Sequence, residues 1–97
     1  MKGKTKNYHA FLIQSLKDPE EAAEYLNEAL ETGEPRYFLK ALRNVAEAFG
    51  GVGKVAEATK LDRTNLYRML SKEGNPELYS VFILLRTLGI RLTARAA

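Results

Sequence analysis

A helix-turn-helix spacing in residues 52–72, VGKVAEATKLDRTNLYRMLSK, constrains the fold of this chain more than any other feature. Ala56 is small enough to let two short helices cross closely, and Leu66 is the core residue one turn into the second helix. Asp62 is expected to cap that helix because its side chain can accept backbone N–H groups that otherwise lack partners. Lys60 stands in the turn where Gly is common because the backbone tends toward positive φ, so we expect modest strain there. The spacing predicts two crossed helices joined by a tight turn.

The second helix of this motif has a polar face on the side opposite Leu66 and Leu70. A recognition helix presents such a face to the major groove of DNA. Arg63 or Arg68 can form two parallel hydrogen bonds with guanine, which contribute roughly 1–3 kcal/mol of base discrimination. An ordinary helical bundle with a solvated basic face remains the alternative interpretation. The candidate DNA-binding residues are Arg63, Thr64, Tyr67, Arg68, Lys54, Ser71 and Lys72.

Charge is distributed unevenly along the chain. At 97 residues the chain is expected to form a single domain, with an N-terminal helical arm over residues 1–34 and a helical core over residues 35–92. The formal charge is only +3, but residues 1–35 carry a net −3 and residues 36–97 a net +6. The basic part contains the helix-turn-helix, as binding to phosphates requires, although +6 is also compatible with simple solubility.

Several classes of function find little support in the sequence. Without cysteine the chain can form neither a disulfide nor a thiolate metal site, and His9 is the only histidine, expected to be a surface or packing residue. The glycines at 50–53 lack the GK[ST] ending of a phosphate-binding loop. No apolar run approaches the ~20 residues of a membrane span, and the N-terminus lacks the pattern of a signal peptide. We therefore expect a cytoplasmic protein with no enzymatic activity, no cofactor, no metal and no membrane association.

Helix start and stop signals predict an all-α fold of five to six short helices. A first helical segment follows a basic leader, at Lys2, Lys4 and Lys6, that is expected to fray. Two further helices are bounded by Asp18-Pro19 and Gly33, and by Pro35 and Gly50-Gly51. After the helix-turn-helix, Asn75-Pro76 is expected to cap a last helix, which runs to Leu88 and ends at Gly89.

The helix expected over residues 76–88 is apolar on nearly all sides. Its core-facing side is expected to consist of Leu78, Val81, Phe82, Leu85 and Leu88, while Tyr79, Ile83 and Leu84 add apolar groups elsewhere. A helix that is apolar all round is buried all round, and in so small a domain a second chain can supply the cover. The alternative is that the N-terminal helices fold over it. The candidate residues of a homodimer interface are Ile83, Leu84, Ile90 and Leu92.

The succession of motifs resembles a known family. Its most specific pieces are DPEEAAEYL, FLKALR, LDRTNLYRMLS and EGNP, and the likeness extends from about Leu16 to Leu92. The chain resembles the probable addiction-module antidote proteins, the short HigA-like antitoxins encoded beside RelE/HigB-like toxins. The resemblance implies a λ-repressor-like helix-turn-helix bundle, dimeric binding to double-stranded operator DNA and a complex with a toxin. It also implies that Arg63, Thr64, Tyr67 and Arg68 lie on the DNA-facing helix.

A toxin of this kind binds ribosomal RNA and is expected to be basic. Seven carboxylates between Asp18 and Glu34 form the only concentrated negative charge in the chain, and the candidate toxin-binding residues among them are Glu24, Glu28 and Glu31. A solvated acidic face that merely offsets the basic half is the alternative.

Three functions therefore remain open. The first is an antitoxin of a type II toxin-antitoxin module that neutralises its toxin and represses its own operon. The second is a free-standing phage-type transcriptional repressor, and the third is a helical protein-interaction module. Salt-sensitive binding to promoter DNA separates the first two from the third.

Overall fold

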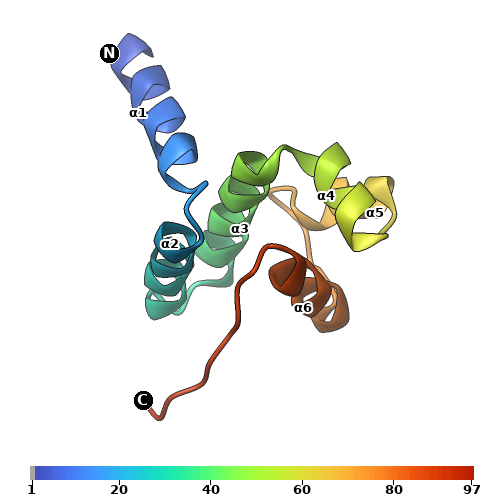
Figure 1. The fold of residues 1–97 in the computed structure, drawn as a ribbon. Helices are drawn as coiled ribbons and strands as arrows, with labels where there is room; N and C mark the ends of the chain where they lie inside the picture. Colours follow the sequence, from blue (N-terminus) through green and yellow to red (C-terminus); the bar gives the residue numbers. More distant parts are fainter. Residues whose placement is uncertain (1) are drawn as a thin grey trace.

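The computed structural model describes residues 2–97, with side chains from Asn7 onward, and this part of the chain is entirely helical apart from its loops (Figure 1). The Cα radius of gyration, 13.3 Å, is that of a compact chain of this length. The prediction of an all-α bundle of five to six short helices is confirmed. The helices described are α1 (Lys2–Ser15), α2 (Pro19–Glu31), α3 (Pro35–Phe49), α4 (Val52–Thr59), α5 (Arg63–Met69) and α6 (Leu78–Thr87).

The boundaries of α2 and α3 follow the local signals in the sequence. The Asp18 side chain accepts a hydrogen bond from the Glu20 N–H at 3.0 Å, and Pro19 occupies the first turn of α2. After α2 the chain turns at Gly33 with φ 73°, and α3 ends at Gly50 with φ 132°, two conformations that favour glycine. α1 begins at Lys2, so the helix includes the basic leader that the sequence analysis placed before the first helical segment.

The helix α6 begins later than predicted. It starts at Leu78 with Glu77 as its N-cap, so the expectation that Asn75 caps it was wrong. Gly74 is buried against the end of α5, and residues 75–77 form the connection from there to α6. The C-terminal end is as predicted: Gly89 has φ 79°, and the Ile90 N–H donates to the Leu85 carbonyl at 2.9 Å.

The hydrophobic core is arranged around α3, which packs against α1 and α2 on one side and α4 on the other (Figure 1). The short helices α5 and α6 in turn pack against α4. This order separates α2 from the helix-turn-helix by the width of α3. The largest fully buried side chains of the core are Leu26, Leu42, Val55, Leu66, Leu70, Leu84 and Leu85.

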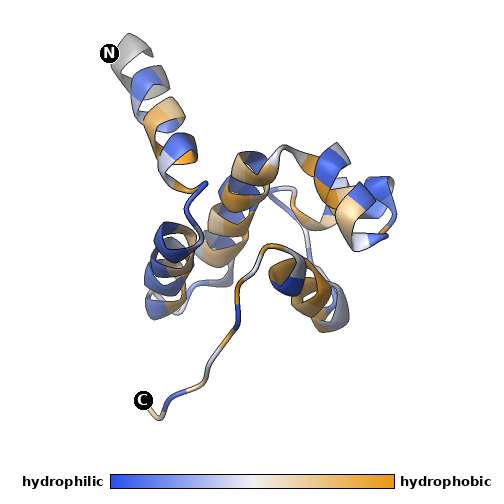
Figure 2. Cartoon of the chain, viewed as in Figure 1, coloured by the Kyte–Doolittle hydropathy of each residue, from blue (hydrophilic) through white to orange (hydrophobic). Residues whose placement is uncertain are grey.

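The rotation of α6 differs from the sequence-based expectation. Leu84 is 0% exposed and Ile90 is 9% exposed within the single chain, so the prediction that they form a dimer surface was wrong. Phe82, expected in the core, is instead 50% exposed. The difference arises because α6 turns the side that carries Val81, Leu84 and Leu85 toward the core around α4, which leaves the opposite side uncovered. Figure 2 shows that α6 is apolar along most of its length.

None of the described helices is long and apolar enough to cross a membrane.

Candidate DNA interface

The turn of the helix-turn-helix is built around one left-handed residue. Lys60 has φ 64° and ψ 13°, which confirms the positive φ predicted at this position, and its N–H donates to the Ala56 carbonyl at 2.9 Å. Thr59 was not singled out from the sequence. Its hydroxyl donates to the Val55 carbonyl at 2.8 Å and accepts from the Leu61 N–H at 3.1 Å, so a buried side chain ties α4 to the turn.

The start of α5 is fixed by the predicted cap. Asp62 has an extended backbone, with φ −64° and ψ 132°, and its side chain accepts a hydrogen bond from the Asn65 N–H at 3.0 Å. Leu66 and Met69 are buried, together with Leu70 just beyond the helix. These contacts orient the rest of the helix toward solvent.

The outward face of α5 consists of Thr64, Tyr67 and Arg68, all of which are exposed. At 100° per residue, Thr64 and Arg68 lie one above the other on the side away from Leu66. Arg63 occupies a different position, at the edge that faces α4. A Cβ atom on Gly53 would lie 3.2 Å from its Nη2 atom, so the guanidinium covers the first turn of α4.

The first turn of α4 is partly exposed and flanked by basic groups. Its N-cap is Gly51 with φ 97°, which has no side chain to satisfy the free N–H groups of the turn. Lys54 is exposed beside it, and its stem lies over Gly50. Positive charge from Lys54 and Arg63 therefore adjoins the positive end of this helix.

The residues that follow α5 differ in whether their polar groups are free to contact a ligand. Ser71 is exposed, but its hydroxyl already donates to the Arg68 carbonyl at 2.7 Å. The Lys72 side chain is exposed, and its backbone carbonyl accepts from Nη1 of Arg36 at 2.5 Å. Sequence analysis missed this contact and its companion, in which Nε of Arg43 donates to the Leu70 carbonyl. The two arginines are seven residues apart on one helix, and this spacing does not identify their carbonyl partners.

The acidic residues lie on the other side of α3. Glu24, Glu28 and Glu31 are all exposed on one face of α2, while Ala22 and Leu26 on the opposite face are buried. Figure 1 places this helix and α5 on opposite sides of α3, and Figure 2 shows α2 as largely hydrophilic.

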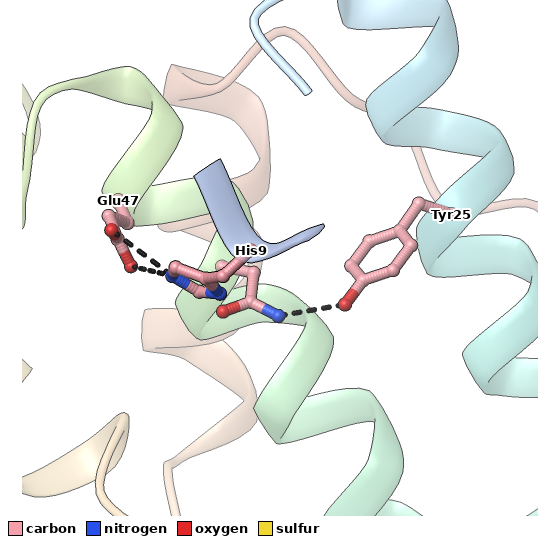
Figure 3. A network of polar contacts seen from close by, with 4 residues as sticks. His9, Tyr25 and Glu47 are labelled. Carbon is pink, nitrogen blue, oxygen red and sulfur yellow. Dashed lines mark hydrogen bonds and ion pairs between the residues drawn. The ribbon is translucent and has the colours of Figure 1, made fainter. Parts of the chain in front are cut away.

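Polar contacts join the first two helices to α3 (Figure 3). Nε2 of His9 pairs with Oε1 of Glu47 at 3.2 Å, with both side chains about half exposed. Three residues earlier on α3, and on the same side of the helix, Nδ2 of the buried Asn44 donates to the Tyr25 hydroxyl at 2.8 Å. His9 is thus a surface residue with a packing role, as predicted. Over residues 7–97, whose side chains the structure describes, no group of three His, Cys, Asp or Glu side chains that could hold a metal ion comes together.

Comparison with known proteins gives one family and one relative. The family described as "Probable addiction module antidote protein" matches residues 6–96. A protein of Haemophilus influenzae, described only as uncharacterized, is 31% identical over 80 residues, which are 82% of this chain and 81% of that protein. No solved structure matches the chain significantly.

Proposed function

The chain belongs to the family of probable addiction module antidote proteins, and from that premise we propose that it neutralises a RelE/HigB-like toxin and represses its own operon by binding operator DNA. An antidote implies a toxin as its partner. The observation that carries DNA binding is the outward face of α5, where Thr64, Tyr67 and Arg68 are exposed while Leu66 anchors the helix in the core.

Within this face we assign base recognition to Arg68, with Thr64 beside it. The guanidinium of Arg68 can donate two parallel hydrogen bonds to N7 and O6 of guanine, and the methyl group of Thr64 can contact the methyl group of thymine. Tyr67 can donate to a phosphate while its ring covers the sugar. Arg68 is favoured over Arg63 because the Arg63 guanidinium lies over Gly53 on α4.

Arg63 and Lys54 are assigned to the phosphate backbone instead. They flank the first turn of α4, and a helix N-terminus with free N–H groups attracts phosphate. Lys72, exposed beyond the end of α5, is suited to a further phosphate. These contacts position the protein on the duplex without reading its sequence.

Fluorescence anisotropy with the promoter duplex and a scrambled duplex tests this assignment. Arg68→Ala should weaken specific binding by about 5- to 150-fold, the equivalent of roughly 1–3 kcal/mol, and leave non-specific binding nearly unchanged. Lys72→Ala should weaken both and reduce the salt slope by about 1. Lys17→Ala, an exposed residue between α1 and α2, removes the same charge and serves as the control. Equal, small effects from all three variants would refute the assigned face.

Binding to a palindromic operator needs two copies of the chain, and the exposed side of α6 is the surface we assign to their contact. Leu78, Tyr79 and Phe82 are exposed there, and Phe82 shares a cavity of about 520 Å³ with Leu92. A twofold dimer buries the same patch on both copies. Its recognition helices then meet half-sites about one helical turn, ~34 Å, apart.

Light scattering tests the dimer. Phe82→Glu should shift the protein toward monomer because a charge would be buried without a partner. Tyr37→Glu introduces the same charge at an aromatic residue of similar exposure, 58%, on α3, and should remain dimeric. A wild-type protein that is monomeric at tens of micromolar would exclude this interface.

The toxin is assigned to the acidic face of α2. The exposed carboxylates of Glu24, Glu28 and Glu31 complement a basic surface, and their place across α3 from α5 lets one molecule hold toxin and DNA at once (Figure 1). Charges at the edge of an interface act mainly on the rate of association.

Changing these three glutamates to lysine should slow toxin association in a surface-binding assay, with an effect that fades as salt rises, and should leave operator binding intact. The matched control changes three exposed glutamates outside α2, namely Glu57, Glu73 and Glu77. Unchanged association at low salt, or equal slowing in the control, would place the toxin elsewhere.

A further inference from the structure

We propose that Arg36 and Arg43 of α3 are positioning residues for operator recognition. They hold the segment that follows α5, residues 70–74, and thereby set the orientation in which α5 meets the major groove. The inference rests on the proposed DNA-binding function. Neither residue needs to touch DNA for this role.

Arg43 acts on the end of α5 itself. A helix leaves its last carbonyl groups without partners inside the helix, and Leu70 is the C-cap residue of α5. Nε of Arg43 donates to the Leu70 carbonyl in a partly buried contact. The cation also lies at the negative end of the helix dipole, where positive charge is favourable. Arg43 therefore provides a side-chain hydrogen bond to the backbone at the C-terminal end of α5, as Asp62 does at the N-terminal end.

Arg36 holds the next stretch of the same segment. Its Nη1 donates to the Lys72 carbonyl at 2.5 Å and to the Gly74 carbonyl at 3.1 Å. Seven residues separate the two arginines, which is about two helical turns, so both project from one side of α3. Together they bind the carbonyl groups of alternate residues 70, 72 and 74.

Gly74 packs its backbone directly against the last turn of α5. It is buried, and a Cβ atom there would lie 2.7 Å from the Arg68 carbonyl oxygen and closer still to that of Met69. Its N–H donates to the Ser71 carbonyl at 3.0 Å. Because the backbone at Gly74 is pressed against the last turn of α5, a shift of residues 70–74 must move that turn.

The contacts matter because α5 is only seven residues long. A helix shorter than ~12–15 residues is marginal by itself, so its orientation depends on what holds its ends. α5 packs against α4, and Met69 and Leu70 at its C-terminal end are buried in the core that includes α3. The arginines add directional hydrogen bonds from α3 to the segment that follows this end. Base contacts require closer alignment than phosphate contacts do, because hydrogen bonds to base edges are directional. Loss of the arginines should therefore lower specific binding selectively.

The test uses the full chain with Arg36→Met and Arg43→Met, which remove the donors and keep the apolar stem. Lys40→Met, an exposed residue between them on α3, removes one positive charge as the matched control. In anisotropy titrations each arginine variant should lose about tenfold or more in affinity for the operator. Affinity for a scrambled duplex and the salt slope should match those of Lys40→Met. Arg36→Lys should restore most of the loss, because a single nitrogen of Arg36 makes both contacts.

Amide hydrogen exchange provides the second measurement. Exchange at residues 66–74 should accelerate in both methionine variants and not in Lys40→Met. Parallel loss on both duplexes with a smaller salt slope would overturn the proposal, since it would mean that the arginines contact phosphate. Full operator affinity in Arg36→Met would also overturn the proposal. Because Arg36 is exposed, this variant is expected to fold even if Arg43→Met does not. A wild-type protein that fails to distinguish the two duplexes would refute the proposed function instead, and unaltered exchange would still refute the positioning role.

Discussion

Replacement of Lys60 by glycine should stabilise the protein. Lys60 is exposed in the turn between α4 and α5 with φ 64°, and a left-handed backbone costs a residue with a Cβ atom roughly 1–2 kcal/mol. Glycine removes that cost but loses about 0.5–1 kcal/mol more backbone entropy on folding. The hydrogen bond from its N–H to the Ala56 carbonyl is kept. The expected net gain in the free energy of unfolding is about 0.5–1 kcal/mol.

Urea denaturation followed by circular dichroism measures this gain, at one fixed protein concentration because an oligomer's stability depends on it. The melting temperature should rise by about 2–8 °C for a domain of this size. Lys60→Ala is the control, because alanine keeps the left-handed strain and removes only the ammonium group. Its stability should differ from wild type by less than about 0.5 kcal/mol. If Lys60→Gly were no more stable than Lys60→Ala, the strain argument would be refuted.

Three further substitutions test the packing described above. Leu84→Ala should lower the free energy of unfolding by about 2–5 kcal/mol in urea titrations, since it opens a cavity at a side chain with 0% exposure; a loss below that of an exposed residue would mean that Leu84 is not in the core. Asp62→Ala should cost about 1 kcal/mol by loss of the cap, and Asp62→Asn much less; equal costs would argue that the cap contributes nothing. Tyr25→Phe should cost about 1–3 kcal/mol because the buried Asn44 amide loses its partner. Thermal melts of Tyr25→Phe beside Tyr37→Phe, an exposed tyrosine, would contradict this if the two shifts were equal.

Much of the fold was predictable because the relevant forces act within a few residues. The cap at Asp18, the proline that opens α3 and the left-handed turn at Lys60 each depend on a side chain and the backbone beside it. The same is true of the Asp62 cap, which fixes the start of α5. Helix number, most boundaries and the exposed face of α5 therefore followed from the sequence.

The buried face of α6 could not be predicted from the sequence. A helix that is apolar on nearly all sides gives no pattern from which to choose its buried face, and the choice made from the sequence put Phe82 inside and Leu84 outside. In the structure α6 packs against α4 with Leu84 buried and Phe82 exposed. Which apolar side chain is buried depends on the shape of the neighbouring helix, and that shape is absent from the local sequence.

The sequence by itself determined that this chain forms short helices with a helix-turn-helix in its basic half, since caps, positive φ and helical periodicity are local properties. Tertiary structure alone decided how α5 is held. Arg36 and Arg43 precede their carbonyl partners by 27 to 38 residues, and only the folded path of α4, α5 and the following loop brings them together. A guanidinium group can pair with any exposed carbonyl, so its partner is set by which backbone the fold places within hydrogen-bond distance.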